Sequence, residues 1–599
     1  MKQIYHFTRT AGKQQSLKAG VALLLMGVML TLLPASVSAQ VLKLFTQRTS
    51  NYSPDMPIYH IKGDYTMIGN TNVTFSNVTL DDDNNSTSNN NSAMKYVDVD
   101  GNTFSTINSS TAALTFSNEF GANPACSEVL YAGLYWTGRD NDNTMERTIT
   151  EVEYTLNSGG EIGGYTLTIT PNGDNERIFT FTNGSESVVL TMRCNNNRYN
   201  VYNGDNQIYD KRGNRNSHLA EFITTDGFSV EDNSIPLNDN YSITELYWNS
   251  TLSECYATVR DVTPFIVSRN RIKIKHANAP EYTEMEATLD NIYYSGQNGM
   301  TDYQGFYAAY VEVTDYVRQY GLGNYTVADL ETHVGSGDNT GWIGGWCMVV
   351  VYENSKMKWR DITLFDGFAR VDRDDAPEIE IPISGFKTVQ VGDINMKLGM
   401  VAAEGDAGIP NDGCKIEKRN TGEFSTLTHN GYTNNGGFFN SSIQTGGNDR
   451  YPNYGNNTGI DIITLNINSE QNDPNAILYN EQTSTTFQFT STQDLYFPFC
   501  FVMGVDAYIP EAEALSGVMN IDEDDITIDS QTGNYLIEPG KEITFAVEVK
   551  NFGTEDIVNA KLEIPLPSTI EYYYAEVDYV YPGINIEGYF DAERYSRER

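Results

Sequence analysis

The sequence has few basic residues, and this shortage excludes one class of partner. Lys and Arg number 39 against 79 Asp and Glu, so the 599-residue chain carries a net charge of −40. A field of this sign repels the phosphate backbone of nucleic acids and the surface of anionic membranes. We therefore expect neither nucleic-acid binding nor attachment to acidic lipid.

Catalytic and zinc-binding signatures are also lacking. The histidines are scattered without HExxH spacing, and no GxSxG, P-loop or GxGxxG motif occurs. Glu378 and Glu380 have the spacing to share one face of a strand, and glycoside hydrolysis needs two nearby carboxylates. Among 79 acids such pairs arise by chance. We expect a protein that is not an enzyme and that has no catalytic residues.

Cysteines are sparse as well. The chain has six, and none shows the CxxC spacing of a zinc or redox site. Cys347 and Cys500 lie in apolar, strand-like runs and are expected to be buried core thiols. If a disulfide forms, Cys194 and Cys255 are the expected pair, although spacing does not define connectivity.

The longest apolar run lies at the N-terminus, and the later runs are too short to span a membrane as a helix, so no transmembrane segment is expected after cleavage. Basic residues precede an apolar run at 21–33, and small residues lead from it to Ala39. This order predicts a secretory signal peptide over residues 1–39. The alternative is a membrane anchor, for which the run is short. Residue 40 is Gln, so no lipid-modified cysteine is expected there, and we expect a secreted protein of the extracellular cell surface.

Aromatic residues and alternating segments are abundant. Aromatics make up 12% of the chain, led by 39 Tyr, a composition that suits strands joined by turns. The segment 165–170 alternates with period two, whereas 129–136, 346–352 and 495–505 are continuous apolar runs typical of strands buried on both faces. The segment 310–317 fits either a strand or a short helical turn. The sequence predicts an all-β protein with a large β-sandwich or jelly-roll-like head.

Changes in composition divide the chain. We expect a β-rich head over 40–515, with an insertion or subdomain at 146–268, followed by a separate alternating unit over 516–599. The Asn, Asp and Ser run at 81–92 is too polar to pack, and it predicts a solvated loop. The Asp366-Gly367 pair predicts a turn between strands.

Three stretches carry a family resemblance. They are 130–138 (LYAGLYWTG), 313–317 with the Gly-rich 321–327, and 345–353 (GWCMVVVYE) with 360–368. In this order they resemble the N-terminal head of large adhesin-like cell-surface proteins common in Bacteroidetes, whose heads precede tandem Ig-like repeats. The last unit, residues 516–599, resembles one such repeat, and the resemblance implies a partial C-terminal Ig-like β-sandwich repeat there. Because that family continues through many repeats, a truncated product is one expectation. Trp136, Trp342 and Trp346 are expected to anchor the core of the head.

Calcium is the one cofactor for which the sequence offers candidate ligands. Three groups of oxygen-bearing side chains suit a hard cation in an extracellular protein: Asp98 with Asp100 and Asn102; Asp372 with Asp374 and Asp375; and Asp522 with Asp524 and Asp525. The last group lies between head and repeat, where a cation would neutralise repelling acids. We therefore expect Asp522, Asp524 and Asp525 as calcium ligands. The alternative for each group is a solvated acidic loop.

Three functions remain open at this point. The resemblance implies an exported, non-catalytic adhesin-like or structural protein that binds a host, matrix or bacterial surface ligand, either a glycan or a protein. Tyr- and Asn-rich segments at 196–200 and 450–454 carry groups that hold glycans, although they also fit ordinary surface loops. The alternative is a secreted carbohydrate-active enzyme or glycan-binding protein with an appended β-module. The third function is a structural component without a specific ligand.

Overall fold

The structure is a computed structural model that divides into two compact units, residues 1–507 and 508–599. It describes residues 41–52, 56–84, 89–100, 106–140, 144–184, 186–214, 216–222, 234–294, 305–374, 376–390, 392–429, 437–471, 473–507, 512–521, 537–551 and 570. The predicted signal peptide lies outside these residues.

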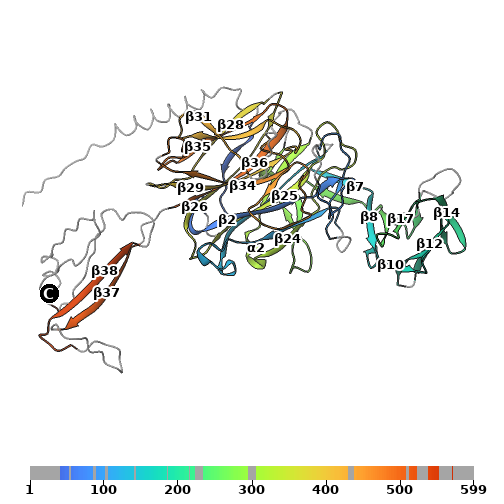
Figure 1. The fold of residues 1–599 in the computed structure, drawn as a ribbon, viewed down its shortest axis with the longest axis horizontal. Helices are drawn as coiled ribbons and strands as arrows, with labels where there is room; N and C mark the ends of the chain where they lie inside the picture. The colour runs from blue at the N-terminus through green and yellow to red at the C-terminus, as the bar shows by residue number, and fades with distance from the viewer. Residues whose placement is uncertain are drawn as a thin grey trace, which may run out of the picture. The chain divides into compact units, whose positions relative to one another are not determined.

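A twelve-stranded sheet forms the centre of the first unit (Figure 1). Ten of its strands follow one another in the order β22 (Ile292–Tyr294), β23 (Phe306–Glu312), β6 (Glu128–Arg139), β25 (Gly344–Glu353), β2 (Tyr59–Thr71), β26 (Trp359–Ala369), β36 (Leu495–Asp506), β29 (Ile394–Ala403), β34 (Ile460–Ser469) and β32 (Ile443–Gln444). Two further strands lie outside this order: β1 (Val41–Gln47) pairs with β26, and β27 (Val371–Asp372) pairs with β36. All pairings are antiparallel except β32 with β34.

Strand β2 joins two parts of this sheet by changing its partner. Residues 59–62 pair with β26, and residues 63–71 pair with β25. Gly63 stands at the change, where a Cβ atom would lie 2.1 Å from the carbonyl oxygen of Tyr352. We call β22, β23, β6 and β25 the first half-sheet, and β26, β36, β29, β34 and β32 the second half-sheet.

The two half-sheets pack face to face, and each has a cover sheet on its other side. Phe306 of β23 meets Phe497 of β36 across the interface, with ring centroids 4.6 Å apart. The first cover sheet packs on the first half-sheet and contains β21 (Thr283–Glu286), β20 (Arg271–His276), β24 (Gly323–Ala328), β5 (Ser109–Leu114) and β33 (Arg450–Tyr451). The second cover sheet contains β28 (Glu378–Ser384), β35 (Ser484–Ser491), β30 (Asp412–Lys418) and β31 (Glu423–Thr426). Its Phe487 and Phe489 stack on Phe501 of β36.

Residues 146–268 form a module with a core of its own. Its first and last strands, β7 (Glu146–Ile149) and β19 (Phe265–Ser268), pair as a two-stranded stem. One sheet contains β14 (Asn206–Arg212), β13 (Arg198–Asn203), β12 (Glu186–Asn195), β11 (Glu176–Asn183), β10 (Tyr165–Pro171) and β9 (Glu161–Ile162). The other contains β15 (Ser217–Glu221), β17 (Tyr241–Asn249), β16 (Ile235–Pro236), β18 (Glu254–Asp261) and β8 (Val152–Asn157). Apolar side chains from both sheets form one buried cluster, so the module is a β-sandwich.

The remaining elements are short. Strands β3 (Val73–Phe75) and β4 (Met94–Tyr96) form a two-stranded sheet, and the helix α2 (Thr314–Tyr320) packs against β6. In the second unit, β37 (Ala512–Ile521) pairs with β38 (Ile543–Asn551). Among the described residues, no helix combines the length and the apolar character that a membrane crossing requires.

The fold confirms the all-β prediction. The continuous apolar runs at 129–136, 346–352 and 495–505 are strands β6, β25 and β36, which are covered on both faces. Trp136, Trp342 and Trp346 are buried. The segment 310–317 combines both predicted forms, since it spans the end of β23 and the start of α2.

Two details of the sequence analysis were wrong. Asp366 and Gly367 do not form a turn but lie within β26, where the buried Asp366 carboxylate pairs with Arg48 at 2.6 Å. Gly367 leaves room for β1, since a Cβ there would lie 2.8 Å from the carbonyl oxygen of Lys43. Cys194 and Cys255 are both free thiols rather than a disulfide, whereas Cys347 and Cys500 are buried as expected.

A buried ion pair anchors the stem of the module to the first half-sheet. The Arg269 guanidinium donates two hydrogen bonds to the Asp140 carboxylate, at 2.7 and 2.6 Å. Both side chains are almost fully buried, at 2% and 1% exposed. The Arg269 carbonyl accepts a further bond from the indole N–H of Trp136 at 2.9 Å. Arg269, which directly follows β19, therefore holds the stem through two contacts: its side chain pairs with Asp140, and its backbone carbonyl bonds to the core residue Trp136.

We expect the Arg269→Met variant to lose about 3–5 kcal/mol of unfolding free energy, because it leaves a buried carboxylate without its counter-ion. The double variant Arg269→Met with Asp140→Leu is expected to recover most of that loss, since it removes both charges. Urea unfolding of the chain from Gln40 onward, followed by Trp fluorescence, measures both. Arg373→Met, which breaks an exposed pair with Asp374, is the control and should leave the midpoint unchanged. Equal stability of Arg269→Met and wild type would contradict this reading.

Candidate functional site

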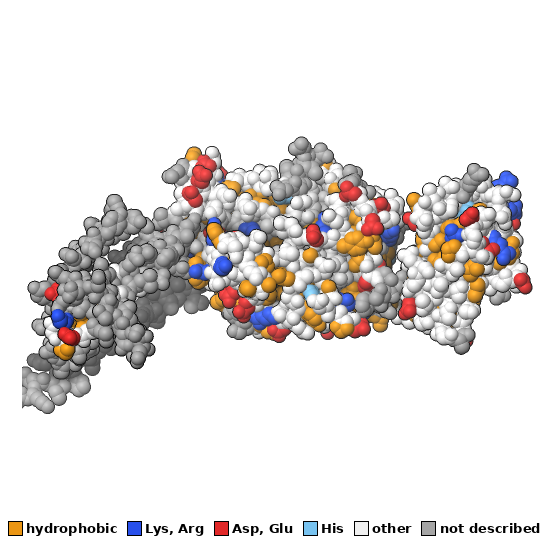
Figure 2. Space-filling model, turned by 60° about the horizontal axis from the view of Figure 1, so that its bottom comes forward, with side chains coloured by type: hydrophobic (Ala, Val, Ile, Leu, Met, Phe, Trp, Pro, Cys, Tyr) orange, Lys and Arg blue, Asp and Glu red, His pale blue; other side chains and the backbone are white. Residues whose placement is uncertain are grey.

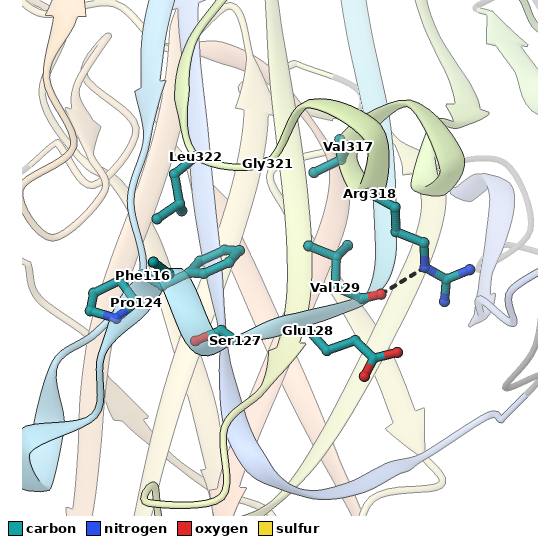
Figure 3. A pocket seen from close by; sticks show the side chains of 10 residues that line it. Phe116, Pro124, Ser127, Glu128, Val129, Val317, Arg318, Gly321 and Leu322 are labelled. Atoms are coloured by element: carbon teal, nitrogen blue, oxygen red, sulfur yellow. Dashed lines mark hydrogen bonds between the residues drawn. The ribbon is translucent and has the colours of Figure 1, made fainter.

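An apolar pocket opens beside the start of β6 (Figure 3). It has a volume of about 570 Å³, within the range of small-ligand sites. Its walls come from the 3₁₀ turn Pro124–Cys126, the first residues of β6 and the end of α2. The side chains that matter for its chemistry are Phe116, Val129, Val317 and Leu322, which are apolar, and Glu128 and Arg318, which are charged.

The pocket is held in shape by contacts of its lining. The Phe116 ring stacks on Tyr352 of β25, with centroids 3.9 Å apart. The Arg318 guanidinium donates to the carbonyl oxygen of Val129 at 2.8 Å, which ties α2 to β6 (Figure 3). The Arg318 guanidinium also donates to the carbonyl oxygen of Leu130 at 3.3 Å and lies 3.7 Å from Asp315, and its side chain is 30% exposed. The pocket thus offers an apolar floor with one carboxylate and one guanidinium at its rim.

The predicted calcium ligands Asp522, Asp524 and Asp525 lie outside the described residues. Within those residues, no three or more His, Cys, Asp or Glu side chains are arranged to hold a metal ion. The prediction for the linker therefore stays a prediction.

The other two predicted acidic groups find partners in the protein itself. Asp98 accepts a hydrogen bond from the Ser109 hydroxyl at 2.9 Å, and Asp100 accepts one from the Tyr282 hydroxyl at 2.5 Å. Asp372 pairs with Arg370, and Asp374 with Arg373 at 2.9 Å. Asn102 and Asp375 lie outside the described residues. These carboxylates are used in local contacts and do not converge on a common point.

The segments singled out for enzymatic or glycan chemistry have ordinary surroundings. Glu378 and Glu380 share the exposed face of β28, as predicted, and Glu380 accepts a bond from Gln488 at 3.3 Å. Tyr454 is buried rather than open to a ligand, and Arg450 donates to its carbonyl oxygen at 2.7 Å. In the segment 196–200, Asn196 and Asn197 form the exposed turn between β12 and β13, whereas Tyr199 lies in β13 and is buried.

Five buried carboxylates gather at one end of the second half-sheet. Glu404 and Asp406 follow β29, Asp412 begins β30, Asp461 lies in β34, and Asp494 precedes β36. None is more than 4% exposed. The antiparallel register brings them together, because the end of β29 pairs with the starts of β34 and β36. We call these residues the carboxylate cluster.

Backbone amides satisfy only part of the carboxylate cluster. The N–H of Asp406 donates to Asp494 at 3.1 Å, and the N–H of Asn89 donates to Asp406 at 2.9 Å. Asp461 accepts three bonds from the N–H groups of residues 440–442. Within the described part of the chain, one oxygen each of Glu404, Asp406 and Asp412 has no hydrogen-bond partner. None of the five carboxylates forms an ion pair with the described basic side chains.

Burial and mutual repulsion raise the pKa values across the carboxylate cluster. Burial raises the pKa of Asp406 to about 6 and that of Asp412 to about 8, with Asp406 adding to the shift at Asp412. Burial, and then Asp494 and Asp406, raise the pKa of Glu404. Burial and the neighbouring carboxylates likewise raise the pKa of Asp494. The cluster therefore disfavours its own ionisation at neutral pH.

The polar run at 81–92 contributes to this site, and its prediction as a solvated loop was wrong in part. Asn84 and Asn89 are buried, at 2% and 0% exposed. Asn84 donates to the carbonyl oxygen of Asn456 at 3.0 Å, whereas neither amide atom of the Asn89 side chain has a hydrogen-bond partner. Polarity alone did not indicate burial, because the loop packs through hydrogen bonds with residues far along the chain.

Charge elsewhere is dispersed on the face that Figure 2 shows. Asp and Glu side chains form small separate groups there, mixed with Lys and Arg, and uncharged surface lies between them. The carboxylate cluster differs from this surface because its charges are close together and away from water.

We expect the stability of the protein in chelator to fall as the pH rises from about 4 to about 8. An unfolded Asp releases its proton near pH 4, whereas folded Asp406 and Asp412 keep theirs to about pH 6 and 8. Their protonated forms therefore stabilise the folded state at low pH, and this contribution is lost as pH passes the folded values. Asp412→Asn removes one such group and should flatten the decline by an amount on the order of a few kcal/mol.

Thermal unfolding in EDTA between pH 5 and pH 8 measures this difference. Asp374→Asn, at an exposed carboxylate, is the matched control and should follow wild type. Parallel profiles of Asp412→Asn and wild type would contradict the shifted pKa.

The sequence matches no protein-family model and no curated protein. Among solved structures, a crystal structure of PNGF-II aligns over 63% of this chain and 99% of that chain, with 9% sequence identity and a TM-score of 0.13. A likeness of that size carries no argument about fold or function.

Proposed function

We propose that this protein is an exported, non-catalytic, adhesin-like protein of the cell surface that binds a surface ligand through the apolar pocket of its head. The observation that carries the proposal is the position of the pocket. Glu128 and Val129 of its lining directly precede the first stretch of the family resemblance, 130–138, and three further lining residues, Val317, Gly321 and Leu322, belong to the second, 313–317 with 321–327.

The third stretch, 345–353 with 360–368, includes most of β25, which packs beside the pocket lining. Strand β25 pairs with β6, with Trp346 opposite Trp136, and its Tyr352 stacks on the Phe116 ring of the lining. The Thr314 hydroxyl accepts a bond from the N–H of Ala132 at 3.0 Å, which fixes the start of α2 on β6. Residues of the family resemblance therefore line one part of the pocket and hold other parts of it in place.

The lining indicates the kind of group that would bind. An apolar floor favours an aliphatic or aromatic group, and the rim charges of Glu128 and Arg318 favour a polar group beside it. A side chain on a partner protein, or the apolar face of a sugar with its hydroxyls, has this combination. Affinity of a single such contact is modest, so adhesion would depend on many copies at a surface.

A glycan ligand is the second candidate, and a feature of the inserted module favours it. Tyr247 and Tyr256 are register partners on β17 and β18, and their half-buried rings stack with centroids 4.7 Å apart. Glu245 accepts a bond from Thr258 at 3.0 Å on the same face. Aromatic rings beside hydroxyl and carboxylate groups suit sugars, which present both C–H faces and hydroxyls.

We expect the chain from Gln40 onward to bind at least one class in a panel of glycans, matrix proteins and bacterial surfaces. The variant Ala125→Trp should weaken that binding at least tenfold, because the indole would fill the pocket from its exposed rim. Surface plasmon resonance gives the two affinities.

Two further variants make the result specific. Ala93→Trp adds the same ring at an exposed position that is not part of the pocket lining and should bind as wild type does. Loss of binding in Tyr247→Ala with Tyr256→Ala, but not in Ala125→Trp, would assign the ligand to the module instead. Absence of binding by folded wild-type protein would reject the adhesin.

A further inference from the structure

We infer that the carboxylate cluster, together with the amide oxygen of Asn89, is a binding site for calcium. This site is separate from the predicted one at the linker, and the inference does not depend on the proposed adhesin function. It rests on the position of oxygen atoms without hydrogen-bond partners, and on the lack of a basic side chain that pairs with these carboxylates among the described residues.

The first step is the supply of ligand oxygens. Asp406 and Asn89 are both fully buried and are joined through the Asn89 N–H, and Asp494 is joined to Asp406 in the same way. One oxygen of Asp406, one of Glu404 and the Asn89 amide oxygen have no hydrogen-bond partner among the residues that the structure describes. Carboxylate, amide and backbone oxygens in irregular arrangements are the ligands that calcium takes in proteins.

The second step is the lack of any other counter-charge. Arg139 is the basic side chain that acts on Glu404, but its guanidinium is engaged with Asp338 at 2.7 Å and with the carbonyl oxygen of Gly341. The other buried acids of the head have such partners, as Asp366 has Arg48 and Glu331 has Arg147. Buried carboxylates without a cation are costly, and a divalent ion would neutralise two of them at once.

The third step concerns geometry. The acids of the described structure do not converge on one point, as expected of carboxylates that repel one another. Glu404 and Asn411 both have positive φ angles, of 79° and 71°, so the segment between β29 and β30 is held in an unusual path beside the cluster. The Asn89 N–H already donates to Oδ1 of Asp406, so these two residues are held beside each other and the second oxygen of Asp406 remains for an ion. The ion would take its remaining ligands from Asp494 or Glu404, backbone carbonyls and water.

Thermal unfolding of the chain from Gln40 onward, in EDTA and in 2 mM calcium at pH 7.5, tests the inference. We expect calcium to raise the unfolding temperature by at least about 3 °C. The variant Asp406→Asn should unfold at a higher temperature than wild type in EDTA, because one repelling charge is gone, and should no longer respond to calcium. Opposite effects in the two buffers distinguish a lost ligand from a damaged core.

A triple variant provides the matched control. Asp522→Asn with Asp524→Asn and Asp525→Asn neutralises the linker acids and should keep the calcium response of the head. Terbium emission excited through the aromatic side chains gives a second readout that does not depend on stability, and it should be lost in Asp406→Asn and in Asn89→Ala. An unchanged calcium response in Asp406→Asn, or a response abolished only by the linker variant, would overturn the inference.

Discussion

Desolvation of charge is the constraint on which this structure depends. Each half-sheet is covered on both faces, so a polar group that enters it leaves water completely. Charged side chains inside the head consequently occur in tight pairs, such as Asp140 with Arg269 and Asp366 with Arg48, at 2.6 Å in both cases. Such pairs contribute little net stability compared with apolar residues, but they make the arrangement of the surrounding strands specific. The carboxylate cluster is the exception, because none of its acids forms an ion pair with a described Lys or Arg side chain.

Much of the fold could be predicted from the sequence, because strands that are buried on both faces are continuous apolar runs in the sequence. Continuous apolar runs such as 346–352 can be strands only where both sides are covered, and such strands do form the half-sheets. Alternating segments such as 165–170 lie in the module, where one face of each sheet is open to water. The all-β class followed from these two patterns together.

The sites were less predictable, because they join residues that lie far apart in the sequence. Asn89 belongs to a polar run whose composition indicates solvation, yet it lies against Asp406. Asp366-Gly367 has the composition of a turn, yet it continues a strand, since Arg48 compensates the charge and the missing Cβ admits β1. In each case the partner, more than 300 positions away along the chain, decides the outcome, and local patterns carry no information about it.

The change of partner along β2 has a consequence for how the chain acquires its fold. This strand lies near the start of the described residues, while its partners β25 and β26 begin at Gly344 and Trp359. Pairings across so long a loop form slowly, because the loop must close before any contact stabilises it. During that interval β2 presents two unpaired edges and an apolar surface, which are the features that promote aggregation. A newly made chain thus depends on protection of β2 until both of its partners are available, the second of which ends at residue 369.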